Sequence, residues 1–387
     1  MSIYFDHAAT TPMSEAGLQA MVEQVGKLGN ASSLHSPGRS VRKDVEEARE
    51  LLSRLVGAAP SEIIFTGSGT EANNLVIKGT FWTRKQEDSR RNVVVISAFE
   101  HHAILDPVEW MQEHQGAEII YIPITAAGYV DLEALREIIA TRRDEIALIA
   151  VMHSNNEVGT IQPIAEVVNI AGDIPVHSDA VQSFTKVDFS FAQLGLTSAT
   201  ISAHKIGGPL GVAALILRRG IDITPILHGG GQERDIRSGT LNAPGIVAFA
   251  AAAQDAISHR SETQIRVREL KNLLVKLVQE VLPDVTVNGS VGPSLPGIVN
   301  LTFPGTESDG LLLLLDAEGI FCSTGSACSA GVPRPSHVLL AMGLSERTAR
   351  SSLRFSLGAS STEAEVQFLA SAIPAVVTRA RAALVRG

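Results

Sequence analysis

The sequence predicts an α/β protein, with a large domain built on a mostly parallel sheet and a smaller α+β domain at the C-terminal end. Helix-like and strand-like segments alternate from about residue 14 to residue 256, which is typical of a parallel sheet covered by helices on both faces. After that point the pattern changes to one long amphipathic helix followed by short strand-like pieces. A length of 387 residues also exceeds what one small core accommodates and favours two or three domains.

The elements of the large domain follow from the spacing of apolar residues. Helical spacing occurs at 38–56, 71–85, 131–141 and 162–171. Short apolar runs, typical of buried strands, occur at 92–98, 118–124, 145–152, 174–178, 198–202 and 211–217. Because parallel strands need long crossover connections, the helices between these runs support the parallel arrangement. We assign residues 14–258 to this domain.

The C-terminal part begins with an amphipathic helix predicted over 258–282. Strand-like pieces at 285–288, 297–303 and 351–357 surround a helix predicted at 307–318. The last helix opens with Thr362 and Glu365, a capping-box pair. We assign residues 259–387 to the small domain and expect residues 1–13 to fold back onto it.

Bulk properties exclude several classes of protein. A net charge of −9 argues against a nucleic-acid-binding surface. The two cysteines, Cys322 and Cys328, cannot form a disulfide framework, and their spacing does not match a Cys-x-x-Cys site for zinc or redox chemistry. No apolar run is long enough to span a membrane, and the N-terminus lacks a secretory signal. We therefore expect a cytoplasmic, soluble enzyme.

Lys205 is a candidate for covalent catalysis. It follows the apolar run at 198–202 and precedes a Gly-Gly-Pro turn, so we expect it where a buried strand ends. Burial lowers the pKa of a lysine, and a neutral amine can form a Schiff base with a carbonyl cofactor. A lone lysine at a strand end is more often a solvated turn residue. Asp179, which lies 26 residues upstream with Gln182 shortly after it, favours the catalytic alternative.

Asp179 ends another apolar strand and indicates which cofactor Lys205 would bind. A carboxylate in that position can keep the ring nitrogen of pyridoxal phosphate protonated, which makes the ring an electron sink. The cofactor phosphate needs backbone N–H groups, and the Gly-Ser-Gly turn at 67–69, with a helix beginning at Thr70, offers them. Such a turn alone is weak evidence because most only reverse the chain, and it lacks the Gly-Lys-Ser/Thr of a P-loop.

A series of motifs along nearly the whole chain carries a family resemblance. They lie at 6–12, 29–33, 70–74, 100–102, 153–157, 202–205, 228–231, 237–240, 323–328 and 354–358. Each motif is weak alone, but their occurrence together in this order is specific. The chain resembles the pyridoxal-phosphate-dependent cysteine desulfurases of the NifS/IscS type, in the class-V aminotransferase superfamily. The resemblance implies the aspartate-aminotransferase-like fold, fold type I of these enzymes.

The resemblance also implies how the cofactor is held. Gly69 and Thr70 with Ser202 and His204 would bind its phosphate, and Asn156 and Gln182 would bond its 3-hydroxyl oxygen. Asn155, beside Asn156, is expected only to shape the turn. Thr240 would come from the second subunit of a homodimer. It follows a polar loop at 232–237 that has little reason to be ordered unless another surface receives it.

By the same resemblance, His101 stacks on the cofactor ring and moves protons. From the residues alone, His101 is equally consistent with a buried histidine bonded to a backbone carbonyl. A metal site at Glu100-His101-His102 lacks a third ligand cluster, so no metal is expected. Arg354 lies in a strand-like run, where its charge is costly unless an anion pairs with it. The resemblance makes Arg354 the clamp for the substrate carboxylate, assisted by Asn30, although a strand arginine can also reach solvent.

Cys328 decides the reaction. It lies among Ser, Gly and Ala residues in a segment with little apolar anchorage, which favours a loop that can move. Cys322, flanked by Ile320 and Phe321, is expected to be a packing residue. In the family's reaction, Lys205 removes the α-proton of bound L-cysteine and the Cys328 thiolate attacks the substrate sulfur, leaving a persulfide and releasing alanine. A protein acceptor for iron–sulfur cluster assembly or tRNA thiolation would receive the sulfur.

Three alternatives remain. An aminotransferase or a selenocysteine lyase would share Lys205, Asp179 and Gln182; the Cys328 segment argues against the first and only weakly against the second. A serine hydrolase needs an acid and then a histidine after its serine, and no acid lies between Ser329 and His337. A non-catalytic scaffold leaves Lys205, Asp179 and Cys328 unexplained.

Overall fold

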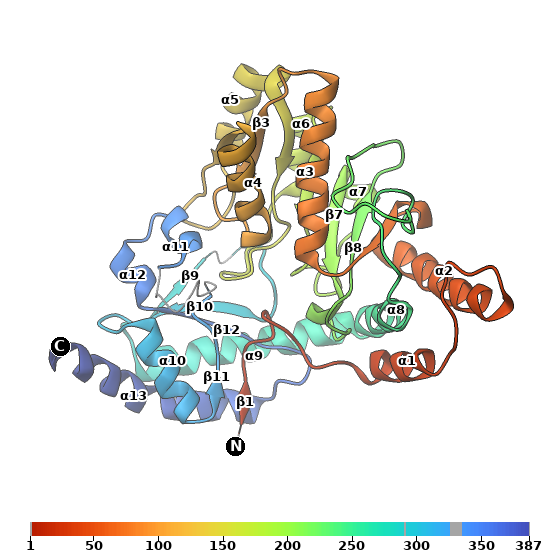
Figure 1. Ribbon diagram of the computed structural model, residues 1–387. Coiled ribbons are helices and arrows are strands. Elements are labelled where there is room, and N and C mark those ends of the chain that lie inside the picture. The colour runs from red at the N-terminus through yellow and green to blue at the C-terminus, as the bar shows by residue number, and fades with distance from the viewer. Residues whose placement is uncertain (1, 290–291, 326–334, 387) are drawn as a thin grey trace.

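The computed structural model describes residues 2–289, 292–325 and 335–386. Within these residues, a seven-stranded sheet forms the centre of the molecule (Figure 1). Its strands, in spatial order, are β2 (Ile63–Thr66), β8 (Ala213–Leu217), β7 (Ser198–Ser202), β6 (Val176–Asp179), β5 (Ile146–Ala150), β3 (Val93–Ser97) and β4 (Glu118–Ile122). The pairings from β7 to β4 are parallel, whereas β8 is antiparallel to β2 and β7. The prediction of a mostly parallel sheet is confirmed.

Helices cover both faces of this sheet because its strands are apolar on both sides. Along β3, Val93 and Val95 face one core, and Val94 and Ile96 face the other. The first core is closed by α2 (Ser36–Val56), α5 (Leu132–Arg142), α6 (Ile164–Ala171) and α8 (Ala243–Ser258). The second is closed by α3 (Gly69–Glu87) and α4 (His102–Gln115).

Three helices of more than ten residues in the described part of the chain escaped prediction, each for a physical reason. α1 (Glu15–Val25) leaves most of its apolar residues exposed, so its sequence lacks a clear buried stripe. α4 contains Pro107, which usually interrupts a helix. α8 is rich in alanine and buried on several sides, and a helix that is apolar all round shows no amphipathic period.

The C-terminal part forms its own sheet and core. The order β12 (Ser352–Ser356), β10 (Ile298–Thr302), β9 (Thr286–Asn288) is antiparallel, and α9 (Arg260–Val281), α10 (Ser308–Ala317) and α13 (Glu363–Arg386) pack against it. The capping box of α13 is confirmed, since Glu365 accepts the Thr362 N–H at 2.7 Å and Thr362 accepts the Glu365 N–H at 3.3 Å.

The N-terminal segment crosses from one part of the molecule to the other (Figure 1). β1 (Ile3–Tyr4) pairs in parallel with β11 (Ile320–Phe321), and Ile3 and Phe5 lie in the C-terminal core. In the opposite direction, Val338 of α11 (His337–Ala341) and Ala349 of α12 (Glu346–Arg350) pack against the core of the large sheet. The division at residue 258 remains our prediction. No helix in the described residues is long and apolar enough to span a membrane.

Candidate active site

A cavity of about 410 Å³ lies where the carboxyl ends of β6 and β7 meet the start of α3, the N-terminal segment and β12. Ligands in open α/β sheets bind at this edge, beyond the carboxyl ends of the strands. Ten of the residues predicted from sequence line it: Gly69, Thr70, His101, Asn156, Asp179, Gln182, Ser202, His204, Lys205 and Arg354. Two do not line it, Asn30 and Thr240, and Cys328 lies outside the described residues.

Lys205 lies where the sequence predicts it, in a single 3-10 turn directly after β7. Gly207, at φ 85°, completes the turn in a conformation that favours glycine. The Lys205 Nζ donates to the backbone oxygens of Ala8 and Ala9, at 2.7 Å each. Burial, with the nearby Arg354 charge, lowers the pKa of Lys205 to about 8, although Asp179 and Asp6 oppose the shift. A substantial fraction of this amine is therefore neutral near physiological pH.

Asp179 is held rigidly at the end of β6. Its Oδ1 accepts the Val181 N–H at 3.0 Å, and its Oδ2 accepts the Asn73 amide at 2.7 Å. Asn73 Oδ1 in turn lies 3.0 Å from Nε2 of the buried His177. Sequence reasoning missed Asn73 and His177 as partners, because the network joins α3 to β6 across 106 and 104 residues of chain. The network fixes the orientation of the carboxylate.

His101 is the N-cap of α4, and this explains the orientation of its ring. Its Nδ1 accepts the Ala103 N–H at 3.0 Å. A neutral His101 therefore carries its proton on Nε2. Burial is the main cause that lowers its pKa, which favours the neutral ring. The sequence-based alternative, a histidine bonded to a backbone carbonyl, is wrong for Nδ1, which is bonded to a backbone N–H.

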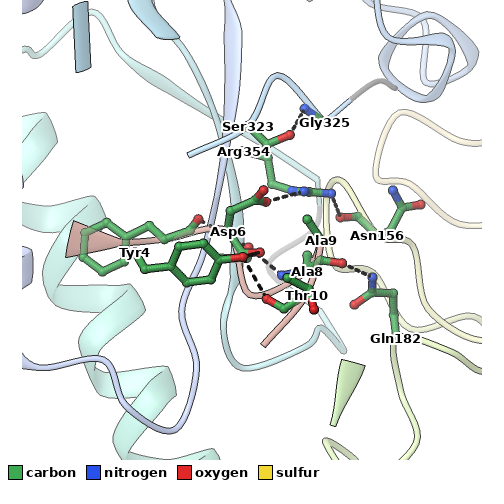
Figure 2. Close-up of polar contacts among 12 residues, drawn as sticks. Tyr4, Asp6, Ala8, Ala9, Thr10, Asn156, Gln182, Ser323, Gly325 and Arg354 are labelled. Carbon is green, nitrogen blue, oxygen red and sulfur yellow. Dashed lines mark hydrogen bonds and ion pairs between the residues drawn. The ribbon is translucent and has the colours of Figure 1, made fainter. Parts of the chain in front are cut away.

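The two adjacent asparagines differ in their surroundings. Asn155 shapes the turn, because its Oδ1 accepts the N–H groups of Glu157 and Val158 at 2.8 and 3.0 Å. The neighbouring Asn156 lines the cavity. Gln182, which also lines the cavity, donates from Nε2 to the Ala8 oxygen at 2.8 Å, as Figure 2 shows.

Arg354 is buried on β12 and joins three separate segments (Figure 2). Its Nη2 donates to Asp6 Oδ1 at 2.6 Å, and its Nη1 donates to the Asn156 backbone oxygen at 3.0 Å. Its Nε is buried without a partner among the described residues. Because a buried unpaired donor is costly, this side chain is suited to an anionic ligand in the cavity. Sequence reasoning missed Asp6 as the anion that compensates the strand arginine.

The start of α3 lies at the cavity. Ser68 caps the helix by accepting the Glu71 N–H at 3.0 Å, and Gly69 and Thr70 line the cavity beside Ser202. A helix of this length carries partial positive charge at its N-terminus. The predicted phosphate turn thus has the expected local structure.

The donor set fits pyridoxal phosphate. One cavity joins hydroxyl and backbone donors suited to a phosphate, a fixed carboxylate suited to a ring nitrogen, and an amine of lowered pKa suited to a carbonyl carbon. An amide group, Gln182, is available for the ring hydroxyl oxygen. The volume lies in the range of small-molecule sites.

Two buried glutamates, Glu100 and Glu157, lie at or next to the cavity, and the sequence analysis assigned them no role. Burial raises the pKa of Glu100 to about 8 and that of Glu157 to about 7. Glu100 Oε1 accepts the Ser97 hydroxyl and the Met152 N–H, and Glu157 Oε2 accepts the Ser336 hydroxyl at 2.5 Å. A large protonated fraction at neutral pH limits the negative charge that they bring to the site.

The loop that carries Thr240 is ordered by its own chain, so the expectation that it needs another surface is wrong. Glu233 is 1% exposed and forms a bidentate salt bridge with Arg49, with N–O distances of 2.7 and 2.8 Å. Arg237 pairs with Glu71 at 2.7 Å. Thr240 itself is exposed. Asn30 is also exposed, and its Oδ1 accepts the Ser32 N–H; among the described residues it does not line the cavity, so its assignment to the substrate remains a prediction.

Cys322 is a packing residue, as predicted. It is 8% exposed within the C-terminal core, and burial strongly raises the pKa of its thiol. A thiol of raised pKa is a poor nucleophile.

Comparison with known proteins is consistent with the geometry. The family model for class-V aminotransferases matches residues 3–369. An IscS-like cysteine desulfurase from Mycobacterium tuberculosis is 49% identical over 383 residues, which cover 98% of this chain and 97% of that protein.

Solved structures agree in fold over nearly the whole length. A NifS-like protein superposes with a TM-score of 0.90 at 34% identity, covering 98% of this chain and 100% of the other. The protein SspA, solved in complex with cysteine, gives a TM-score of 0.80 at 33% identity, covering 93% and 100% of the two chains.

Proposed function

Because the chain belongs to the class-V aminotransferase family and, within it, to the IscS-like cysteine desulfurases, we propose that it converts L-cysteine to L-alanine and keeps the sulfur as a persulfide on Cys328. The observation that carries the proposal is the meeting of Lys205, Asp179 and Arg354 in one cavity. An amine, a fixed carboxylate and a guanidinium are what an amino acid and a carbonyl cofactor need. The cysteine bound to SspA, a protein of the same fold, supports the substrate class.

Pyridoxal phosphate is the proposed cofactor, and when bound it supplies an electron sink for negative charge at the substrate α-carbon. Lys205 is the residue that would hold it covalently, and Gly69, Thr70, Ser202 and His204 would hold its phosphate. Asp179 would keep a proton on the ring nitrogen, a task that suits a carboxylate fixed by Val181 and Asn73.

The substrate would be oriented by Arg354, whose unpaired Nε can donate to its carboxylate. Lys205, with a pKa lowered to about 8, can take the α-proton, because part of the amine is neutral at pH 7 to 8. His101, which carries its proton on Nε2 when neutral, can donate a hydrogen bond on its side of the cavity.

Sulfur transfer requires a second thiol. The Cys328 thiolate attacks the substrate sulfur, so a sulfur–sulfur bond forms while the bond between that sulfur and the substrate β-carbon breaks. The bonding pair remains on the carbon, which takes up a proton and becomes the methyl group of alanine. Cys322 cannot substitute, since it is buried and its thiol has a raised pKa.

A homodimer is part of the proposal. Large apolar side chains are exposed on α1 and the segment after it: Leu18, Val22, Val25, Leu28 and Leu34. Monomeric proteins rarely expose so many neighbouring apolar residues. Thr240, exposed at the end of a well-anchored loop, would then reach the partner's cavity.

We further propose that a protein acceptor takes the sulfur, for iron–sulfur cluster assembly or tRNA thiolation, and that the enzyme works in the cytoplasm. Reducing conditions, such as those found there, keep the thiol of Cys328 free to act as a nucleophile.

The test is to incubate the purified protein with pyridoxal phosphate and L-cysteine, then measure alanine and the mass of the cysteine peptides. We expect a visible absorption band, alanine formation, and one added sulfur on the peptide that contains Cys328. Cys328→Ser should keep the band, and cysteine should still change it, yet no alanine should form. Cys322→Ser is the matched control and should remain active. Alanine production by Cys328→Ser, or a persulfide on Cys322, would refute the mechanism.

A further inference from the structure

Two hydrogen bonds hold the side-chain amide of Gln182 in one orientation. Its side chain lines the cavity, and the residue is 6% exposed. Its Oε1 accepts a hydrogen bond from Lys186 Nζ at 3.1 Å, and its Nε2 donates to the Ala8 oxygen at 2.8 Å. The two ends of an amide are chemically opposite, so rotating this group by half a turn would present an acceptor to the cavity instead of a donor.

Lys186 selects between these two orientations. A lysine ammonium has three donors and no acceptor, so it pairs with the oxygen of an amide and not with its NH₂ group. The Gln182 nitrogen is thereby directed toward Ala8 and the cavity. It carries two hydrogens, and the described part of the chain supplies one acceptor for them, the Ala8 oxygen. The second hydrogen is available to a ligand oxygen.

The backbone before Lys186 is strained, which is an independent sign that its position matters. Thr185 adopts φ 67°, a left-handed conformation that is unfavourable for a β-branched residue, and it is 6% exposed. Such outliers persist only where the surrounding structure enforces them, and they concentrate at functional sites. The turn brings Lys186 to a second cavity of about 510 Å³, which also contacts Ala8 and Lys205.

We propose that Lys186 is a positioning residue that fixes the Gln182 amide with its N–H toward the cofactor's hydroxyl oxygen. This proposal rests on the proposed function and extends it by one residue that does not line the active-site cavity. Lys186 touches neither substrate nor cofactor, and its effect passes through Gln182.

The charges around Lys186 set the pH range over which it can only donate. Burial, followed by the charges of Lys205 and Arg354, lowers the pKa of Lys186 to about 7. Lys186 in turn helps to lower the pKa of His7 and of His204, each to about 4, so both face it as neutral rings. The ammonium form, which can only donate, therefore predominates below about pH 7.

The experiment is a pH titration of the visible band of the bound cofactor. The proton that titrates is held by an electron pair of the cofactor's hydroxyl oxygen. A hydrogen-bond donor beside that oxygen draws on the same electrons, so losing the donor makes the proton harder to remove. We expect Lys186→Met and Lys186→Gln to raise the midpoint by about one pH unit, a tenfold change in the proton equilibrium. Lys186→Arg, which again can only donate, should leave the midpoint near that of the wild type.

Two controls separate this role from a structural or purely electrostatic one. Lys271 is also a half-buried lysine, with a pKa lowered to about 8, and it does not line the active-site cavity, so Lys271→Met should not shift the midpoint. In a Gln182→Met background, Lys186→Met should add little, because the residue that it positions is gone.

The cofactor dissociation constant, measured by adding pyridoxal phosphate to the cofactor-free protein, should follow the same pattern. An unchanged midpoint in Lys186→Met, or an equal shift without the Gln182 amide, would overturn the proposal. A wild-type protein that acquires no visible band would instead contradict the proposed function.

Discussion

The reactivity of Lys205 comes from residues that lie far from it in sequence. Burial and the Arg354 charge lower its pKa to about 8, and the oxygens of Ala8 and Ala9 hold its nitrogen in place. The sequence around Lys205 predicts a strand end and a turn. The lowered pKa of Lys205 depends on β12, which carries Arg354, and on the N-terminal segment, since both line the cavity around it.

Asp179 yields the prediction at the residue scale. Asp179→Ala should still bind the cofactor, because the proposed phosphate-binding residues and Lys205 are unchanged. Turnover should fall by about a hundredfold or more, which is the usual effect of losing a preorganised electrostatic group. Asn73→Ala, which removes one of the two groups that orient the carboxylate, should cost about tenfold in turnover. Steady-state alanine production and the visible spectrum report both effects. Wild-type turnover in Asp179→Ala would show that the carboxylate does not support the electron sink.

At the scale of elements, the site depends on how the N-terminal segment seats against the C-terminal sheet. The Ala8 N–H donates to the Ser356 hydroxyl at 2.8 Å, and Asp6 pairs with Arg354. Gly358, two residues after β12, allows the close approach: a Cβ there would lie 2.3 Å from Nδ1 of the His7 ring. The His7 ring is itself held by Thr11 at 2.8 Å and is 4% exposed.

Gly358→Ala should therefore destabilise the protein by about 1–3 kcal/mol, because the added methyl must displace a buried ring. The displaced segment also carries Ala8 and Ala9, so cofactor retention should weaken in parallel. Gly310→Ala is the matched control: apart from its chain neighbours and its own helix backbone, no described atom lies within 4 Å of its Cβ position on α10, and alanine should stabilise that helix by up to about 1 kcal/mol. Urea unfolding measures both. A neutral Gly358→Ala would mean that the segment is not tightly seated.

At the scale of the whole molecule, two kinds of surface residue point outward from the subunit. The first kind is the set of exposed apolar side chains on α1 and in the segment after it. The second is Thr240, which is exposed and does not line the cavity of its own subunit. Arg49 and Glu233 anchor that loop firmly, so its tip is presented in a fixed position. A second subunit would cover the first surface and receive the second.

Val22→Glu places a charge on the α1 surface, where Val22 is 64% exposed. We expect it to convert a dimer into a monomer that retains cofactor poorly, since burying an unpaired charge in an interface is unfavourable. Leu313→Glu, at a residue 71% exposed on α10, is the control and should leave the dimer intact. Analytical ultracentrifugation with absorbance at the cofactor band resolves both properties. A fully loaded, active wild-type monomer would disprove the dimer.

The amino-acid sequence by itself determined the alternating architecture, the strand-end positions of Lys205 and Asp179, the glycine turn before α3 and the packing role of Cys322. These follow from local patterns: apolar periodicity, turn residues and flanking composition act over a few neighbouring residues. Tertiary structure decided what no local pattern contains. It paired Asp6 with Arg354 across 348 residues, joined Asn73 to Asp179, buried Glu233 against Arg49 and placed Lys186 behind Gln182. The reason is physical, because charge pairing, desolvation and amide orientation depend on which distant segments share a dry interior.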